Sequence, residues 1–197
     1  MVFVFDMGGV LMVHDIPTCI ERFKKLLGDN FPKLGLGPDG EGTFLMEQFE
    51  TGRIGEDEFI RYVLSLARPG TTAQDVIDSW VSMHKEIPQD RIDDLRRIKN
   101  MGYRLFLLSN NNEIHWKDVQ ANYDLSGIFE MEFLSFREHI SKPDPRLFQL
   151  VMDRTGIPAS EIVFIDDLES NRRAAEALGW SAVSTVSEAL ELALAAR

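Results

Sequence analysis

The sequence predicts an α/β protein: a Rossmann-like parallel sheet of about five strands with helices on both faces, plus an inserted helical domain. Apolar runs alternate with helical patterns from about residue 90 onward, which indicates βαβ units. The stretch from His14 to Pro88 offers helical patterns and no convincing strand. Polar residues follow three of the apolar runs, and open α/β sheets bind their ligands at the carboxyl ends of their strands.

The first strand covers Val2–Phe5, where four consecutive apolar residues fit burial on both faces. Helical patterns follow it, broken by glycine- and proline-rich pieces such as Pro32–Gly42. We expect residues 14–88 to form a helical cap and residues 1–13 and 89–197 to form the core, the alternative being one larger core. A cap above the strand ends can close on a substrate. The expected cap helices are Ile16–Leu27, Thr43–Glu50, Glu56–Leu66 and Thr72–His84.

The remaining elements follow from helical spacing and from short apolar runs. Ile92, Leu95 and Ile98 repeat at helical spacing ahead of Gly102, a residue type that often ends helices. The expected helices are Arg91–Met101, Arg146–Thr155 and Asn171–Leu178. The expected strands are Tyr103–Leu108, Met131–Leu134, Ile162–Ile165 and Trp180–Val183.

The composition excludes several classes of protein. With 44% hydrophobic and 27% charged residues, the 197-residue chain is of the ordinary globular type. Its net charge of -11 disfavours nucleic acids and anionic membranes as partners, because both attract clustered Lys and Arg. Cys19 is the one cysteine, which fits a reducing compartment. The apolar start is interrupted by Asp6, so neither a signal peptide nor a membrane span is predicted, and we expect a cytoplasmic monomer or homodimer.

Asp6 ends the first strand and precedes Gly8 and Gly9, which allow a turn in which backbone amides approach a ligand. Asp6 is therefore a candidate nucleophile or metal ligand; the alternative is a solvated residue before a turn. The second strand leads into Ser109 and Asn110, which present a hydroxyl and backbone amides at the same edge. Asn111 or Asn112 then caps the following helix. The N-terminus of that helix either binds an anion, or the cap only stabilises the helix.

Two further segments carry charge. Lys142 precedes Pro143-Asp144-Pro145, where Asp144 is the expected helix cap and the prolines fix the direction of the lysine. Such a lysine either neutralises anionic oxygens or is an ordinary surface residue. Asp166 and Asp167 follow a buried strand, and adjacent carboxylates repel unless a cation intervenes. Oxygen ligands suit Mg²⁺. Asn171 either caps the next helix, the role we expect, or orients the groups around the metal.

Together these four segments resemble the haloacid dehalogenase-like hydrolase superfamily, from residue 3 to residue 183. The resemblance rests on Phe-Asp-Met-Gly-Gly-Val, Leu-Leu-Ser-Asn, Lys-Pro-Asp-Pro and Phe-Ile-Asp-Asp, in that order. The inserted helices match the place where one large branch of the family carries a helical cap. Within the family the chain looks most like small sugar-phosphate phosphatases, including glucose-1-phosphate phosphatase-like members.

The resemblance implies a role for each motif. Asp6 becomes the nucleophile that forms an aspartyl-phosphate, and Lys142 balances charge between Asp6 and the phosphate. Ser109, with Asn110, Gly8, Gly9 and Lys142, binds the phosphoryl group. Mg²⁺ is held by Asp6, the Gly8 carbonyl and Asp166, with Asp167 acting through water. The implied activity is Mg²⁺-dependent hydrolysis of a small phosphomonoester, with a phosphorylated metabolite as the ligand.

Gly8 departs from the family pattern, because most phosphatases of the family have there a second Asp that serves as general acid and base. Three explanations stay open: a good leaving group such as the anomeric oxygen of a sugar 1-phosphate, a proton donor from the cap or from water, or binding without turnover. The last corresponds to a phosphate-binding or interaction module. A 2-haloacid dehalogenase is the other enzymatic alternative, although dehalogenases carry an aromatic residue at position 8.

Residues that contact the substrate are expected on the cap, where the sequence offers few signals. Glu47, Glu50, Arg53 and His14 are polar candidates that also fit solvated positions. Hydrophobic residues Met46, Phe49 and Phe59 are expected in the cap interior, and His115 and Trp116 are candidates to face the site.

Overall fold

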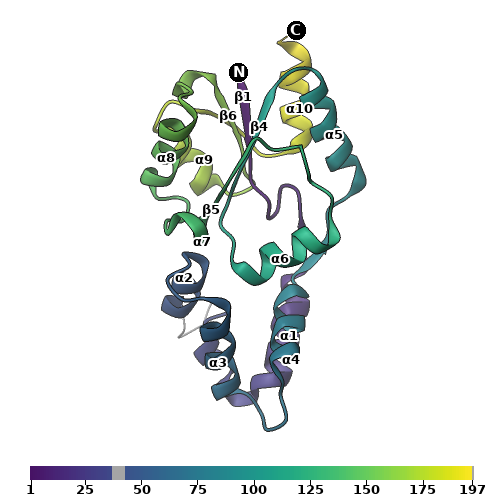
Figure 1. Cartoon of the computed structure of the whole chain (residues 1–197), viewed down its shortest axis with the longest axis vertical. Coiled ribbons are helices and arrows are strands. Elements are labelled where there is room, and N and C mark those ends of the chain that lie inside the picture. Colours follow the sequence, from purple (N-terminus) through teal and green to yellow (C-terminus); the bar gives the residue numbers. More distant parts are fainter. Residues whose placement is uncertain (37–42, 197) are drawn as a thin grey trace.

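The computed structural model describes residues 1–36 and 43–196 (Figure 1), so part of the predicted Pro32–Gly42 break lies outside the described residues. Five parallel strands form one sheet in the order β5-β4-β1-β6-β7. This confirms the predicted α/β fold. The strands are β1 (Val2–Phe5), β4 (Arg104–Ser109), β5 (Met131–Leu134), β6 (Ile162–Ile165) and β7 (Ser181–Val183).

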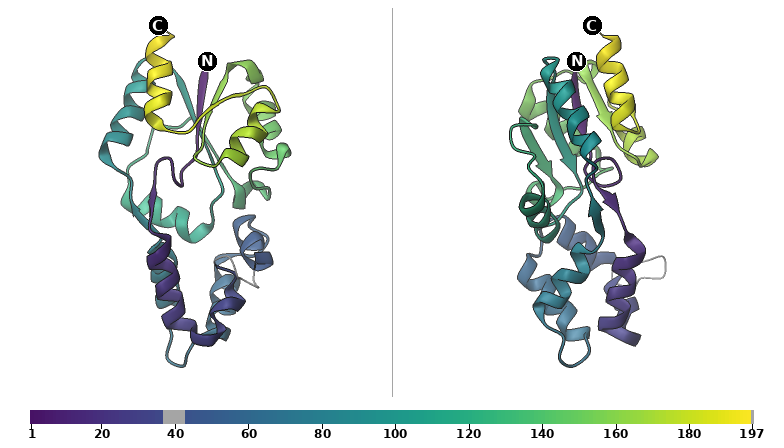
Figure 2. Two further views of the ribbon diagram at one scale, coloured as in Figure 1. Left: turned by 180° about the vertical axis from the view of Figure 1, so that it is seen from behind. Right: turned by 90° about the vertical axis from the view of Figure 1, so that its right-hand side faces the viewer.

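Helices connect the strands and cover both faces of the sheet (Figure 2). Asp144 caps α8 by accepting a hydrogen bond from the Arg146 N–H, as its position before Pro145 predicts. The helix ends at Gly156, which adopts φ 68°. The helices and one 3₁₀ turn are α5 (Gln89–Asn100), α6 (Glu113–Asn122), α7 (Ser135–Glu138), α8 (Pro145–Thr155), η2 (Ala159–Glu161), α9 (Glu169–Glu176) and α10 (Val186–Ala195).

Alternate residues of the central strand point to opposite faces, as in any β-strand. Phe3 and Phe5 pack with residues of α5, α6 and α10. Val2 and Val4 pack on the other face with residues of α8 and α9. All four side chains are buried, which explains why the strand sequence is apolar throughout rather than alternating.

Four helices and a 3₁₀ segment form a bundle of their own at the end of the molecule away from both termini (Figure 1). We call it the helical bundle. Phe23, Phe49, Phe59 and Trp80 are buried in its interior, and Cys19 packs among them as a small apolar residue. Its elements are α1 (Ile16–Leu27), η1 (Gly28–Leu34), α2 (Thr43–Glu50), α3 (Glu56–Leu66) and α4 (Ala73–Val81).

A two-stranded antiparallel ribbon joins the helical bundle to the sheet, and it corrects the expectation that residues 14–88 contain no strand. The ribbon consists of β2 (Val13–His14) and β3 (His84–Glu86), and His14 pairs with His84. Strands of two and three residues are too short to show an alternating pattern, so sequence periodicity misses them. The chain thus enters and leaves the bundle side by side.

A second link joins the bundle to the loop after β4. The Ser135 hydroxyl lies 2.5 Å from the Glu50 carbonyl at the end of α2, and it accepts a hydrogen bond from the Asn111 N–H at 2.8 Å. Ser135 is fully buried, so this hydroxyl fixes the end of α2 against the strand ends. Among the described residues, no helix has both the length and the apolar character needed to cross a bilayer.

Candidate active site

Asp6 and Asp166 directly follow the last residues of the neighbouring strands β1 and β6. Phe5 of β1 pairs with Ile165 of β6, and the Asp6 N–H continues this ladder with a 2.8 Å hydrogen bond to the Ile165 carbonyl. Both side chains therefore project from the same edge of the sheet. Asp166 is fully buried and Asp6 nearly so.

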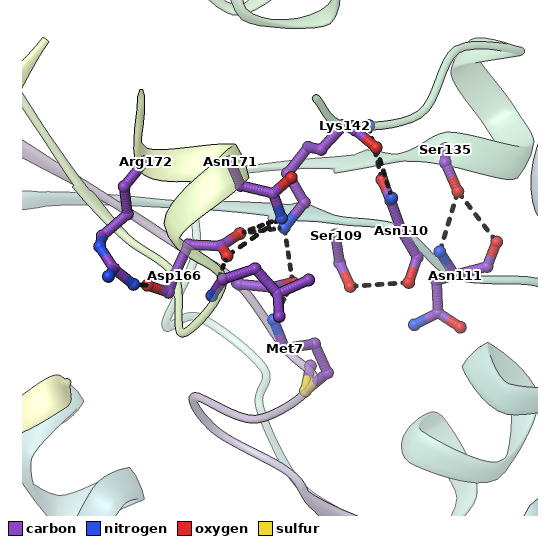
Figure 3. Close-up of polar contacts among 11 residues, drawn as sticks. Met7, Ser109, Asn110, Asn111, Ser135, Lys142, Asp166, Asn171 and Arg172 are labelled. Carbon is purple, nitrogen blue, oxygen red and sulfur yellow. Dashed lines mark hydrogen bonds and ion pairs between the residues drawn. The ribbon is translucent and has the colours of Figure 1, made fainter. Parts of the chain in front are cut away.

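Lys142 lies between these two carboxylates. Its Nζ is 2.9 Å from Asp6 Oδ1 and 2.6 Å from Asp166 Oδ2. The Asn110 side chain holds the lysine backbone, donating to the Lys142 carbonyl at 2.9 Å and accepting from its N–H at 2.8 Å (Figure 3). The side-chain amide of Asn110 thus positions Lys142. The expectation that Asn110 binds phosphate stays a prediction for its backbone N–H.

The environment of Asp6 sets its pKa. Burial raises the pKa of this carboxyl to about 6, against the opposing effect of Lys142 and with a further increase from Asp166. Asp6 is therefore mainly ionised at neutral pH, as a nucleophile must be. The Met7 N–H donates to Oδ1 at 2.7 Å, the same oxygen that Lys142 contacts, so both of these contacts are made by Oδ1 and neither by Oδ2.

Asp166 is fixed by residues of the turn into α9. The Asn171 amide donates to both carboxylate oxygens at 3.0 Å, and the Leu168 N–H donates to Oδ1 at 2.9 Å (Figure 3). The expectation that Asn171 caps the helix is wrong, because α9 begins at Glu169 and Asn171 lies inside its first turn. From there the side chain reaches back to Asp166. Arg172 binds the Asp166 and Asp167 carbonyls.

The carboxylates of Asp6, Asp166 and Asp167 fit a divalent cation. Each offers one oxygen, and these atoms all lie within 4.8 Å of one another. Lys142 offsets one of the three negative charges, so the cluster keeps an excess that a divalent ion neutralises. An all-oxygen donor set with one solvent-exposed member suits Mg²⁺, which retains water ligands. The contribution of the Gly8 carbonyl stays a prediction.

Adding Mg²⁺ is expected to raise the melting temperature of the protein, because an ion that binds only the folded state stabilises it. At a concentration one hundred times Kd, the gain in unfolding free energy is about 2.7 kcal/mol. Asp167→Asn should reduce this gain, whereas the exposed Asp153→Asn on α8 should leave it unchanged. Equal Mg²⁺-induced shifts in Asp167→Asn and wild type, measured by thermal melting, would remove Asp167 from the ligand set.

Gly9 is required beside this cluster. Its φ is +74°, and a Cβ at this position would collide with the Asp167 carboxylate. Only glycine meets both conditions without strain. The predicted glycine turn therefore brings the β1 loop against the acidic cluster.

Ser109 and the N-terminus of α6 form the opposite side of the site. The buried Ser109 hydroxyl makes a long 3.3 Å contact with the Asn110 carbonyl. The Asn112 side chain accepts from the His115 N–H at 3.0 Å, which confirms Asn112 as the helix cap. A hydroxyl beside a helix N-terminus suits an anion such as phosphate. The phosphate-binding role of Ser109 stays a prediction.

A pocket of about 310 Å³ lies between the strand ends and the helical bundle. Of the four polar candidates on residues 14–88, only His14 and Glu50 are among its lining residues in the described part of the chain. Burial raises the pKa of the Glu50 carboxyl. A larger pocket of about 540 Å³ is lined by Trp116, which does not line the 310 Å³ pocket, and by none of the predicted catalytic, phosphate-binding or metal-binding residues. The 310 Å³ pocket is lined by Met7, Gly8, His14, Gly35, Leu36, Met46, Glu50, Trp80, Met83, His84, Ser109, Asn110, Asn111, Asn112 and His115.

His115 forms the rear of this pocket as a neutral imidazole. Its Nε2 lies 3.0 Å from the Trp80 carbonyl and its Nδ1 lies 3.2 Å from the Asn112 amide nitrogen. Only a ring with its proton on Nε2 satisfies both contacts, because Nδ1 must accept from the amide. Burial, followed by the nearby His84, lowers the pKa of His115 to about 3.

This arrangement predicts acid sensitivity. An imidazole that titrates near pH 6.5 when unfolded and near pH 3 when folded lets the unfolded state take up its proton first. The contribution of His115 to stability is therefore complete above about pH 6.5 and falls by about 1.4 kcal/mol per pH unit between about pH 6.5 and about pH 3. His115→Gln should show a shallower decline between pH 6.5 and pH 4.5 in urea unfolding. Parallel curves for variant and wild type would contradict the prediction.

The fold and the site together place three carboxylates and a buried lysine at one end of a parallel sheet, an arrangement suited to a hydrolase. The sequence model of the haloacid dehalogenase-like hydrolases matches residues 1–179, and this chain belongs to that family.

Solved structures and curated relatives agree with the assignment. A HAD-family enzyme from Bacteroides thetaiotaomicron superposes with a TM-score of 0.83 at 34% identity, covering 93% of this chain and 92% of that one. One such structure is a complex with magnesium and inorganic phosphate, at 33% identity and 92% coverage of both chains. The D-ribitol-5-phosphate phosphatase of B. thetaiotaomicron is 26% identical over 90% of this chain and 87% of its own. A Pseudomonas putida (S)-2-haloacid dehalogenase is also 26% identical, over 90% and 80%.

Proposed function

We propose that this chain is a Mg²⁺-dependent phosphatase that hydrolyses a small phosphomonoester through an aspartyl-phosphate on Asp6. The observation that carries the proposal is the position of Lys142, within 2.9 Å of Asp6 and 2.6 Å of Asp166 beside a third carboxylate. Phosphoryl transfer needs positioning and neutralised charge above all, and this cluster supplies both.

The residues of the chain divide the work as follows. Asp6 attacks phosphorus with Oδ2, while Lys142 neutralises the charge that builds up between the carboxylate and the phosphoryl oxygens. Ser109 and the N-terminal end of α6 donate hydrogen bonds to those oxygens. Mg²⁺, when bound by the acidic cluster, supplies further positive charge to the phosphoryl group. Asn171 and Asn110 keep Asp166 and Lys142 in place.

The substrate class is a small phosphorylated metabolite, in line with the 310 Å³ pocket. A sugar or polyol phosphate fits this volume, and the D-ribitol-5-phosphate phosphatase among the relatives supports the choice. Within this proposal, residues 14–88 form a cap whose helical bundle moves against the core to admit the substrate. The paired strands β2 and β3 provide the connection about which it moves, and the motion breaks the contact between the Ser135 hydroxyl and the Glu50 carbonyl.

Phosphate release from a panel of monoesters tests the proposed function. The panel contains p-nitrophenyl phosphate, ribitol 5-phosphate and glucose 1-phosphate, each measured with Mg²⁺ and with EDTA. We expect release with Mg²⁺ and none with EDTA. Absence of release from every monoester overturns the proposal, and ligand-induced thermal stabilisation without product would then favour a binding module.

The dehalogenase relatives make 2-haloacid dehalogenation the second candidate. In that reaction a carboxylate such as Asp6 attacks carbon and no metal is needed. The three clustered carboxylates favour the phosphatase, because a phosphatase of this kind binds a divalent cation there. A dehalogenase needs no metal, which would leave the clustered negative charges without a counter-ion. Halide release from 2-chloropropionate in the presence of EDTA would decide for the dehalogenase.

A further inference from the structure

The space beside Gly8 is filled by the imidazole of His14. A Cβ built on Gly8 would lie 2.6 Å from His14 Cε1 and 3.1 Å from Nε2. The backbone at Gly8 does not have the positive φ found at Gly9, so conformation alone would admit any residue. The ring therefore occupies the place where a side chain at position 8 would begin, and any residue there other than glycine would require the ring to move.

The ring of His14 is held by contacts from two directions. Its strand pairs with β3, and the His14 and His84 rings stack at 5.9 Å with 11° between their planes. His84 in turn contacts Asp118 of α6 through Nδ1 at 2.6 Å, and its ring lies 4.3 Å from that of His115. His14 is thus oriented by a chain of contacts that ends on the same helix as the Ser109 side of the site.

His14 nevertheless remains accessible from the pocket. It is exposed to solvent and lines the 310 Å³ pocket together with Gly8 and Ser109. The His14 ring packs against His84 on one side and faces the pocket on the other, so it can contact a bound substrate. Glu50 lines the same pocket from α2, but in the described part of the chain the three atoms nearest to a Cβ built on Gly8 all belong to His14.

We propose that His14 performs the proton transfers on the leaving-group side of the phosphate, in place of a carboxylate at position 8. The inference rests on the proposed phosphatase function. In-line attack by Asp6 places the leaving oxygen opposite the nucleophile, and the hydrolytic water later enters from the same side. Both therefore lie on the pocket side, where Gly8 and His14 meet.

The two steps balance with His14 as the proton carrier. In the first, an Asp6 oxygen bonds to phosphorus, the bond to the leaving oxygen breaks, and that oxygen takes the proton from His14 Nε2. In the second, a water oxygen bonds to phosphorus, the bond to Asp6 breaks, and the proton of the water passes to Nε2. The products are the alcohol and inorganic phosphate, and His14 regains its starting form.

Quenched-flow kinetics with p-nitrophenyl phosphate and Mg²⁺ separate the two steps. The p-nitrophenolate group leaves without a proton, so His14→Ala should phosphorylate Asp6 at nearly the wild-type rate. Hydrolysis of the intermediate should then be roughly 10²–10⁴-fold slower, the usual value of general acid-base help. The expected result is a burst of one p-nitrophenolate per enzyme, followed by slow turnover, with the phosphoryl group detected on Asp6 by mass spectrometry.

Further variants distinguish proton transfer from support of the fold. His14→Gln keeps a polar side chain without a basic nitrogen and should show the same burst as His14→Ala. Glu50→Gln tests the carboxylate that lines the pocket, and Asp153→Asn at the exposed site on α8 is the control that should turn over without a burst. In Gly8→Asp/His14→Ala a carboxylate takes the vacated space, and turnover should recover at least about tenfold over His14→Ala.

Each outcome bears on the inference. Wild-type turnover in His14→Ala overturns it, and so does an equal loss of burst and steady state in both His14 variants. A burst in Glu50→Gln but not in His14→Ala assigns the role to Glu50 instead. If the wild-type protein releases phosphate from no monoester of the panel, the proposed function itself fails and the inference falls with it.

Discussion

Asp6→Asn is expected to abolish phosphate release, with a loss of about 10⁴-fold or more, because an amide cannot form the covalent intermediate. The substitution keeps the shape of the side chain, and its carbonyl oxygen can still accept the 2.7 Å hydrogen bond from the Met7 N–H. The fold should therefore survive. The measurement is Mg²⁺-dependent phosphate release, with circular dichroism to verify the folded state.

The matched control is Asp153→Asn, which makes the same chemical change at an exposed site on α8 and should retain full activity. Residual activity of more than about one per cent in Asp6→Asn would argue against covalent catalysis by this residue, since removal of a nucleophile costs far more than a hundredfold. Activity lost equally in the control would point to a preparation fault rather than to chemistry.

Lys142→Met is expected to have the largest effect on stability. Lys142 is the cation between Asp6 and Asp166, and its side chain is 1% exposed. Its removal leaves two buried carboxylates without their shared partner, which costs about 3–5 kcal/mol in unfolding free energy. The pKa of Asp6 should rise further, since Lys142 now holds it down, and less of the nucleophile is then ionised at neutral pH.

Urea unfolding and phosphate release measure both consequences. Activity should fall by roughly 10²–10³-fold, in the range seen when one charge-stabilising donor is removed. Mg²⁺ should recover part of the lost stability, because it neutralises the same carboxylates. Lys25→Met, at an exposed lysine of α1, should change the unfolding free energy by less than about 0.5 kcal/mol. An unfolding free energy for Lys142→Met within about 1 kcal/mol of wild type would show that Lys142 does not stabilise the buried carboxylates of Asp6 and Asp166.

The parts of the fold that sequence analysis predicts best are those with a strong local signal. The strands β1, β5 and β6 have the predicted bounds, because β1 and β6 are continuous apolar runs that end at polar residues and β5 is apolar except for Glu132. The helices α1, α2 and α3 also begin and end where their periodicity indicates. The ribbon of β2 and β3 has no such signal, since its pairing joins residues seventy positions apart.

The candidate site divides in the same way. Asp6 and Asp166 are found from their places at the ends of strands and Lys142 from the prolines that follow it, and the structure brings their charged atoms together. Their supporting residues are hidden, because a hydrogen bond across the fold leaves no local pattern. Asn171 is a residue type that often caps helices, and only the observed start of α9 at Glu169 shows that it lies inside the helix. Ser135 offers no sequence signal for its contact with α2.

The close approach of His14 to Gly8 also limits how this sequence can evolve. A side chain at position 8 and a ring at position 14 compete for the same volume, so position 8 is restricted to glycine while the ring keeps its place. A lineage with glycine and histidine cannot gain the second carboxylate by a single substitution without steric conflict. In an alignment of relatives, we therefore expect the two positions to covary, with histidine at the second position found only where the first is glycine.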